Sequence, residues 1–188
     1  MERIHHRVVF FLVLTIAATG ACRQAQSQAA QPMGGMGQMG EMHHGTHPAV
    51  PAGPLKITFG DKSAEWTPEK LAALPHVTLT VHNEHTKTDE TYSGVVLMDL
   101  LKPLGVPEKP HGKDFRFYLE AEGSDGYLVV YSLAEATPDV HDGTILVADS
   151  MAGKPLADDG PLKLIATGEK RPARWVRNLA AIRVLPAQ

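Results

Sequence analysis

Methionine and histidine recur at a fixed spacing near the N-terminal end of the chain. Four of the seven methionines stand at every third position within ten residues, and three histidines follow them closely. Thioether sulfur is a soft ligand suited to Cu(I), and imidazole also suits copper, so a chain that gathers such groups could hold one copper ion. The same composition is typical of a low-complexity linker, in which methionine and glycine keep the chain flexible. Both interpretations stay open for these residues, which are Met33, Met36, Met39, Met42, His43, His44 and His47.

A second pair of candidate ligands, His82 and His85, follows the alternating β-branched segment at residues 77–82. Two histidines at this spacing on a strand end or turn can bind a metal together with a neighbouring acidic side chain. Spacing alone is a weak indication of a metal site. The polar run at residues 86–90 also fits an ordinary solvated hairpin, which is the alternative interpretation.

Positive charge collects at the C-terminal end. The last 27 residues contain six Lys or Arg against one Glu, which gives a local charge of +5. Guanidinium and ammonium groups at this density could form an anion-binding site, of which Lys170, Arg171 and Arg174 would be the natural members. The alternative is a solvated basic loop that balances the acidic residues between positions 139 and 159.

The N-terminus has the pattern of an export signal. Two arginines in residues 1–7 precede an apolar run of 11 residues at 8–18, which ends in small residues. That run is shorter than the roughly 20 residues of a transmembrane helix, so residues 1–21 are predicted to form a signal peptide.

The single cysteine, Cys22, directly follows this signal. The preceding residues Thr-Gly-Ala resemble the bacterial lipoprotein box, although Thr19 stands where leucine is usual. We expect a lipid anchor at Cys22 and hence a periplasmic or membrane-anchored bacterial lipoprotein. Cleavage after Ala21 or near Ala30, without a lipid, is the alternative. In either case the domain that follows has no thiol, so it forms no internal disulfide and offers no thiolate to a metal.

Composition narrows the class of protein. A length of 188 residues, a net charge of −3 and 43% hydrophobic residues describe one ordinary globular domain with a tail. The charge gives no reason to expect nucleic-acid binding, and the phosphate-loop, dinucleotide-fold, zincin and CxxC motifs are absent. Residues 22–53 contain no Leu, Ile, Phe, Tyr or Trp, so they are predicted to be a disordered Met/His-rich tether. The folded domain is predicted at residues 54–186.

Strand patterns dominate this domain, with short helices between them. Helices are predicted after the Thr-Pro-Glu start at residue 67, over 94–104, and for one turn after a Ser132–Glu135 capping box. Strand runs without a regular βαβ alternation predict an α+β fold with a mixed or antiparallel β-sheet. Strands are predicted at 55–59, 77–82, 115–121, 127–131, 144–149, 162–166 and 180–185.

Three segments of this domain resemble the molybdopterin-binding domain of the sulfite oxidase family. Residues 92–101 are similar to its Tyr/Trp-x-Gly-Val-x-Leu-x-Asp-Leu-Leu segment, and residues 124–127 are similar to its Asp-Gly-Tyr turn. Residues 151–176 are similar to its closing section, where a Gly-Pro-Leu-Arg strand precedes a Trp-Val-Lys segment. The resemblance covers residues 54–186 and implies a sulfite oxidase-like molybdopterin-binding fold.

The resemblance also implies where a molybdopterin cofactor would lie. Enzymes of the family hold molybdenum through a cysteine after an early strand, and that position falls on Thr80 here. A neutral hydroxyl cannot replace a thiolate as a strong, soft metal ligand. Lys163 stands where the family has arginine, so the bidentate fork for phosphate is missing. The cofactor-binding residues that the resemblance implies are Thr80, His82, Asn83, Lys170, Arg171 and Arg174.

We therefore expect an exported cell-envelope protein that keeps the fold without molybdenum redox catalysis. It would bind a small anionic ligand, a metal or an envelope protein partner, with a membrane anchor at Cys22 and no nucleic acid. One alternative is a molybdopterin-dependent oxidoreductase that holds the pterin without cysteine. The other alternative is a copper-binding lipoprotein that acts through its Met/His-rich tail.

Overall fold

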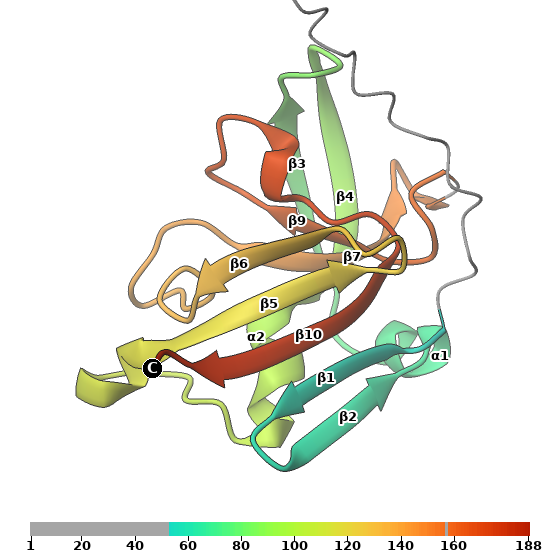
Figure 1. The fold of residues 1–188 in the computed structure, drawn as a ribbon. Helices are drawn as coiled ribbons and strands as arrows, with labels where there is room; N and C mark the ends of the chain where they lie inside the picture. The colour runs from blue at the N-terminus through green and yellow to red at the C-terminus, as the bar shows by residue number, and fades with distance from the viewer. Residues whose placement is uncertain (1–52, 157) are drawn as a thin grey trace, which may run out of the picture. The chain divides into compact units, whose positions relative to one another are not determined.

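The computed structural model describes residues 53–156 and 158–188 (Figure 1). The predicted signal peptide, the lipid-anchor cysteine and the Met/His-rich tether lie outside the described residues. Strands dominate the described part, and its helices are short. In chain order the elements are β1 (Leu55–Phe59), β2 (Lys62–Trp66), α1 (Pro68–Ala72), β3 (Val77–Asn83), β4 (Thr88–Val96), α2 (Leu97–Leu101), the 3₁₀ turns η1 (Lys102–Leu104) and η2 (Gly112–Arg116), β5 (Phe117–Gly123), β6 (Leu128–Ser132), β7 (Ile145–Met151), β8 (Lys154–Pro155), β9 (Lys163–Ala166), the 3₁₀ turn η3 (Pro172–Arg174) and β10 (Leu179–Pro186).

The first sheet has five strands in the order β2-β1-β10-β5-β6 (Figure 1). The first strand of the domain, β1, runs parallel to the last one, β10, so the two ends of the domain sequence lie side by side. The other three pairs are antiparallel. The β5–β6 hairpin reverses at residues 124–126, as the sequence predicts. This sheet is therefore mixed.

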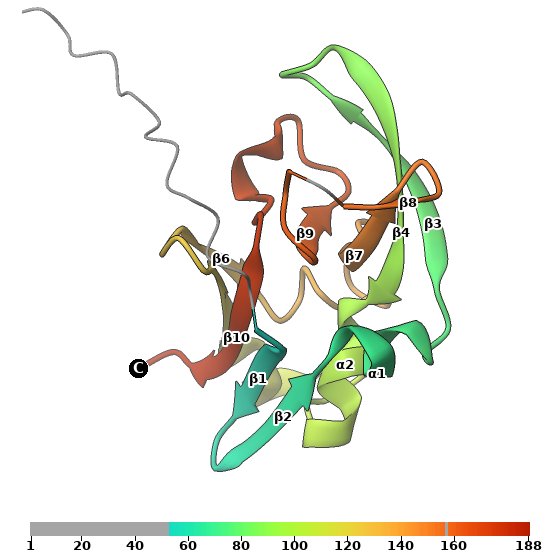
Figure 2. The ribbon, with the colours of Figure 1, turned by 90° about the vertical axis from the view of Figure 1, so that its right-hand side faces the viewer.

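The second sheet is antiparallel and contains β3, β4, β7, β8 and β9 (Figure 2). Its order is β3-β4-β7, and both β8 and β9 pair with β7, along different stretches of that strand. The buried apolar residues of both sheets and of α2 belong to one hydrophobic cluster. Two sheets with few short helices agree with the predicted α+β class, although the prediction did not foresee that the strands divide between two sheets.

Helix α1 begins where the sequence places it. The Thr67 side chain accepts a hydrogen bond from the Lys70 backbone N–H at 3.4 Å, and Pro68 occupies the first helical position, where no N–H donor is needed. The helix buries a single residue, Leu71, and ends before Pro75. Its start and end signals are local, which is why they can be recognised without the structure.

The predicted helix over 94–104 is wrong at its beginning. Gly94 lies in β4, and α2 starts only at Leu97. A Cβ atom on Gly94 would stand 2.1 Å from the carbonyl oxygen of Val147, so glycine lets β4 and β7 approach closely at a point where their register shifts. The end agrees better with the prediction, since η1 continues α2 and Gly105 closes it with φ of 86°.

The seven strand predictions are confirmed, the first with the predicted ends and the others with shifted ends, and β2, β4 and β8 are additions. The Ser132–Glu135 capping pair forms as predicted, with the Ser132 N–H donating to the Glu135 carboxylate at 2.8 Å. It opens a series of hydrogen-bonded turns rather than a helix. In the part that the structure describes, no helix is long and apolar enough to cross a membrane.

Candidate ligand-binding site

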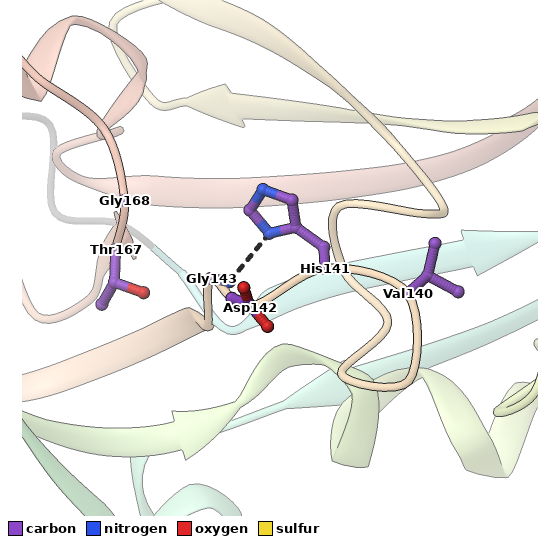
Figure 3. Close-up of a pocket in the computed structure, with 6 residues that line it drawn as sticks. All are labelled: Val140, His141, Asp142, Gly143, Thr167 and Gly168. Carbon is purple, nitrogen blue, oxygen red and sulfur yellow. Dashed lines mark hydrogen bonds between the residues drawn. The ribbon is translucent and has the colours of Figure 1, made fainter.

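A cleft of about 350 Å³ lies between two loops (Figure 3). One loop leads from the β6 turns into β7, and the other joins β9 to η3. A volume of this size is in the range of small-molecule sites. The lining residues are Val140, His141, Asp142, Gly143, Thr167 and Gly168.

The imidazole of His141 is fixed by its own loop. The backbone N–H of Gly143 donates to His141 Nδ1 at 2.9 Å, and Figure 3 shows the ring folded back toward Gly143. Because Nδ1 accepts this bond, the neutral ring carries its proton on Nε2, which faces away from Gly143. A Cβ atom on Gly143 would stand 2.5 Å from His141 Cε1, so this ring position requires glycine. The cleft therefore has one fixed N–H donor.

The opposite wall is joined to this loop by hydrogen bonds. The Thr144 N–H donates to the Thr167 hydroxyl at 2.7 Å, and the Thr167 N–H donates to the Thr144 carbonyl at 2.9 Å. The Thr167 hydroxyl accepts one bond and keeps its own hydrogen for another. Gly168 has φ of +81°, a left-handed conformation that favours glycine and turns the chain away after β9.

A smaller cavity adjoins the cleft and shares His141 with it. Two carboxylates line this cavity, Glu135 and Glu169, and the Arg174 guanidinium bonds to both, at 2.8 Å from Glu135. Burial would raise the pKa of Glu135, but hydrogen bonds from Ser132 and Arg174 outweigh it and hold that pKa below its usual value. The three charged groups thus form a fixed ionic cluster behind the cleft.

The ionic cluster also holds η3 against β6. The Arg174 guanidinium stacks 4.5 Å from the centre of the Tyr131 ring, and its Nη1 donates to the Val130 carbonyl at 3.3 Å. The hydroxyls of Tyr131 and Tyr127 donate to the backbone carbonyls of Arg174 and Ala173. The loop that forms one wall of the cleft is therefore anchored at its far end.

A buried lysine forms a second polar cluster. Lys163 Nζ donates to Asp159 at 2.6 Å and to the Tyr92 hydroxyl at 2.9 Å, and it lies 5.4 Å from the centre of the Trp175 ring. Burial and the hydrogen bond to Glu90 raise the pKa of Tyr92, which keeps this hydroxyl protonated. The ammonium group, the hydroxyl and the carboxylates are all paired within the cluster, so we assign it a structural role.

The structure separates the residues predicted around the early strand. Thr80 lies on the exposed side of the edge strand β3, and its hydroxyl pairs with that of Thr91 at 3.0 Å. His82 is also exposed, with Nδ1 2.7 Å from the Asp89 carboxylate. Asn83 is buried on the opposite face, as strand alternation requires. Neither cavity described above includes these residues.

Asn83 closes the β3–β4 hairpin. Its side-chain oxygen accepts from the His85 N–H at 2.9 Å, and its amide nitrogen donates to Glu90 at 2.9 Å. This is the behaviour of an asparagine in a turn. Within residues 53–156 and 158–188, no three His, Asp or Glu side chains gather as a metal site, so the metal role considered for His82 and His85 is not supported.

The three predicted anion-binding residues divide into two groups. Lys170 and Arg171 are exposed, whereas Arg174 belongs to the ionic cluster. The pKa of the Glu84 carboxyl is lowered mainly by the hydrogen bond from Lys87, and Arg171 lies close enough to lower it further. The loop thus approaches the hairpin that carries His82 and Asn83, but Arg174 is not available to an anion.

These positions do not fit a molybdenum cofactor held as the resemblance implies. Thr80 offers a solvent-facing hydroxyl already paired with another hydroxyl, and the described part contains no cysteine. The guanidinium of Arg174 is occupied by two carboxylates. Copper binding by the methionines and histidines of the tether lies outside the described residues and stays a prediction.

Sequence reasoning assigned no role to His141, which lines both cavities. The only local indication is the His-Asp-Gly order at 141–143, since the glycine lets the histidine ring fold back over its own loop. A search of protein-family models and a search of curated proteins both give no match to the chain.

Proposed function

We propose that this chain is a ligand-binding protein of the bacterial cell envelope, which holds a small polar molecule in the cleft at His141. The observation that carries the proposal is the convergence of a fixed N–H donor, a hydroxyl and a carboxylate on one cavity of about 350 Å³. Binding sites typically combine such a volume with a few convergent polar groups. The envelope location rests on the signal pattern at residues 1–21 and the lipoprotein-like Cys22.

Binding without redox catalysis is the better-supported form of this proposal. A sulfite oxidase-like ancestry would account for the sequence resemblance, while the residue at the metal position, Thr80, has no soft donor. A molybdopterin-dependent oxidoreductase stays the alternative. Finding stoichiometric molybdenum and pterin in natively expressed, processed protein would favour that alternative and refute binding alone.

The test of the cleft is a screen of small polar compounds against the mature full-length chain, followed by amide chemical shifts. We expect binding compounds to shift the amides of Gly143, Thr167 and Gly168. The variant Gly143→Ala should abolish these shifts, because its Cβ displaces the His141 ring. Gly53→Ala is the matched control, since a Cβ there meets nothing within 4 Å. Compounds that bind equally well to the Gly143→Ala protein would contradict the assignment of the site.

Processing is tested separately. Mass spectrometry of the mature N-terminus should find a diacylated or triacylated cysteine at position 22. An unmodified N-terminus beyond that position would refute the lipid anchor and leave the cleft unaffected.

A further inference from the structure

The charge of the cleft comes from Asp142. This exposed side chain lines the cavity, and within the described residues it has no hydrogen bond or ion pair. The next acidic residue of the same loop, Asp139, lies outside the lining and stands 3.9 Å from Lys109. The carboxylate of Asp142 is therefore the charged group of the cavity that a ligand can still pair with.

The groups behind the cleft add negative rather than positive charge. Two carboxylates, Glu135 and Glu169, share the single guanidinium of Arg174, which leaves this cluster with one net negative charge. His141 Nδ1 accepts from the Gly143 N–H, so the ring presents its Nε2–H to the cavity as a hydrogen-bond donor. The unpaired carboxylate charge would repel a small anion that enters the cleft. This argues against the anionic ligand expected from the basic C-terminal end.

The remaining lining groups specify what else the ligand carries. The Nε2–H of His141 needs an oxygen acceptor, and the Thr167 hydroxyl can still donate one hydrogen bond. Val140 is 49% exposed and gives the cavity an apolar side suited to methylene groups. A cationic nitrogen and an oxygen joined by a short carbon chain would satisfy all of these groups.

We infer that the cleft binds a small organic cation of the amino-alcohol class, with its ammonium group on Asp142 and its oxygen near His141 and Thr167. This inference rests on the proposed function, because it names the ligand class of the same cleft. Exposed ion pairs contribute up to about 1 kcal/mol. Loss of the Asp142 charge should thus weaken binding by about fivefold.

The experiment titrates three probes of similar size, ethanolamine, ethylene glycol and acetate, into the mature full-length protein. Amide and imidazole chemical shifts at residues 141–143 and 167–168 report binding in the cleft. We expect ethanolamine to bind most tightly. The variant Asp142→Asn should lose about fivefold in affinity for ethanolamine, whereas Asp139→Asn, an acidic neighbour outside the cavity, should keep it.

Three results would overturn the inference. Ethanolamine could leave the cleft resonances unchanged, acetate could bind more tightly than ethanolamine, or Asp142→Asn and Asp139→Asn could lose affinity equally. A screen compound that shifts the same amides would in each case leave the proposed function standing with a different ligand class. If no compound of the screen shifts them either, the proposed function fails as well.

Discussion

Replacing Lys163 by methionine tests whether the buried ion pair supports the fold. The lysine side chain is 8% exposed, and its ammonium group donates to both Asp159 and Tyr92. Methionine keeps much of the side-chain volume but removes the charge and every N–H donor. The Asp159 carboxylate and the Tyr92 hydroxyl then lose a partner in a poorly hydrated place.

The expected loss of unfolding free energy depends on how far the remaining partner, Asp159, stays buried. Removing one member of a buried ion pair costs about 3–5 kcal/mol when the other charge stays dry. The Asp159 side chain is 21% exposed, and Arg177 Nε lies 3.8 Å from it, so part of the loss is recovered. We expect Lys163→Met to lower the free energy of unfolding by about 2–3 kcal/mol.

A double-mutant cycle separates this ion pair from general damage. Asp159→Asn keeps an oxygen acceptor for Lys163, so it should cost about 1–2 kcal/mol. The double variant should lose less than the sum of the two single losses, by about 1–2 kcal/mol. Urea unfolding followed by tryptophan fluorescence measures all three variants, with exposed Lys154→Met as a control expected within about 0.5 kcal/mol of wild type. Strictly additive losses would refute the pairing, as would a Lys163→Met protein as stable as the control.

Three further predictions concern other parts of the chain. Gly94→Ala should lower the unfolding free energy by about 3 kcal/mol, because the new Cβ would stand 2.1 Å from the Val147 carbonyl oxygen. Urea titrations measure this loss, and a loss below about 1 kcal/mol would contradict the close approach of the two strands. The hydrogen bond to Asp149 raises the pKa of His76 in the folded protein. The stability that this bond contributes is therefore complete below the unfolded-state pKa of about 6.5, and it is lost as the pH rises through the higher pKa of the folded state. The stability difference between wild type and His76→Gln should thus shrink from about pH 6 to about pH 9, and a constant difference would be evidence against the ion pair. Deleting residues 33–47 should abolish Cu(I) uptake, measured by competition with a chelator, and unchanged uptake would exclude the tether as a copper site.

The fold was predictable where a strand alternates between a buried and an exposed face. The first three residues of β1 are buried, exposed and buried in turn, whereas β2 is a sheet edge whose residues are all exposed or half-buried. The end of β4 was read as helix because Val95 and Val96 continue directly into the apolar residues of α2. What makes Gly94 a strand residue is the backbone of β7, which lies more than 50 residues further along the chain.

The candidate site was less predictable than the fold, since long-range contacts decide which polar residues are available. Arg174 looked like an anion ligand in a basic segment, yet Glu135, 39 residues earlier, pairs with it. The sequence around His141 is typical of a loop, and only the fold places the β9–η3 loop opposite it as the other wall of the cavity. Charge counts along a sequence treat such residues as free, although pairing is a property of the folded chain.

The cleft is held in shape by bonds that involve no ligand. Two hydrogen bonds between Thr144 and Thr167 join its walls, and Arg174 anchors the loop of one wall at its far end. The Gly143 N–H holds the imidazole of His141 in place. Binding normally loses affinity to the ordering of loops and side chains, and these bonds already order both walls and the His141 ring. Substitutions that remove these hydrogen bonds should therefore weaken binding although the replaced residues do not contact the ligand. That result would show that the cavity is formed before the ligand binds and is not created by it.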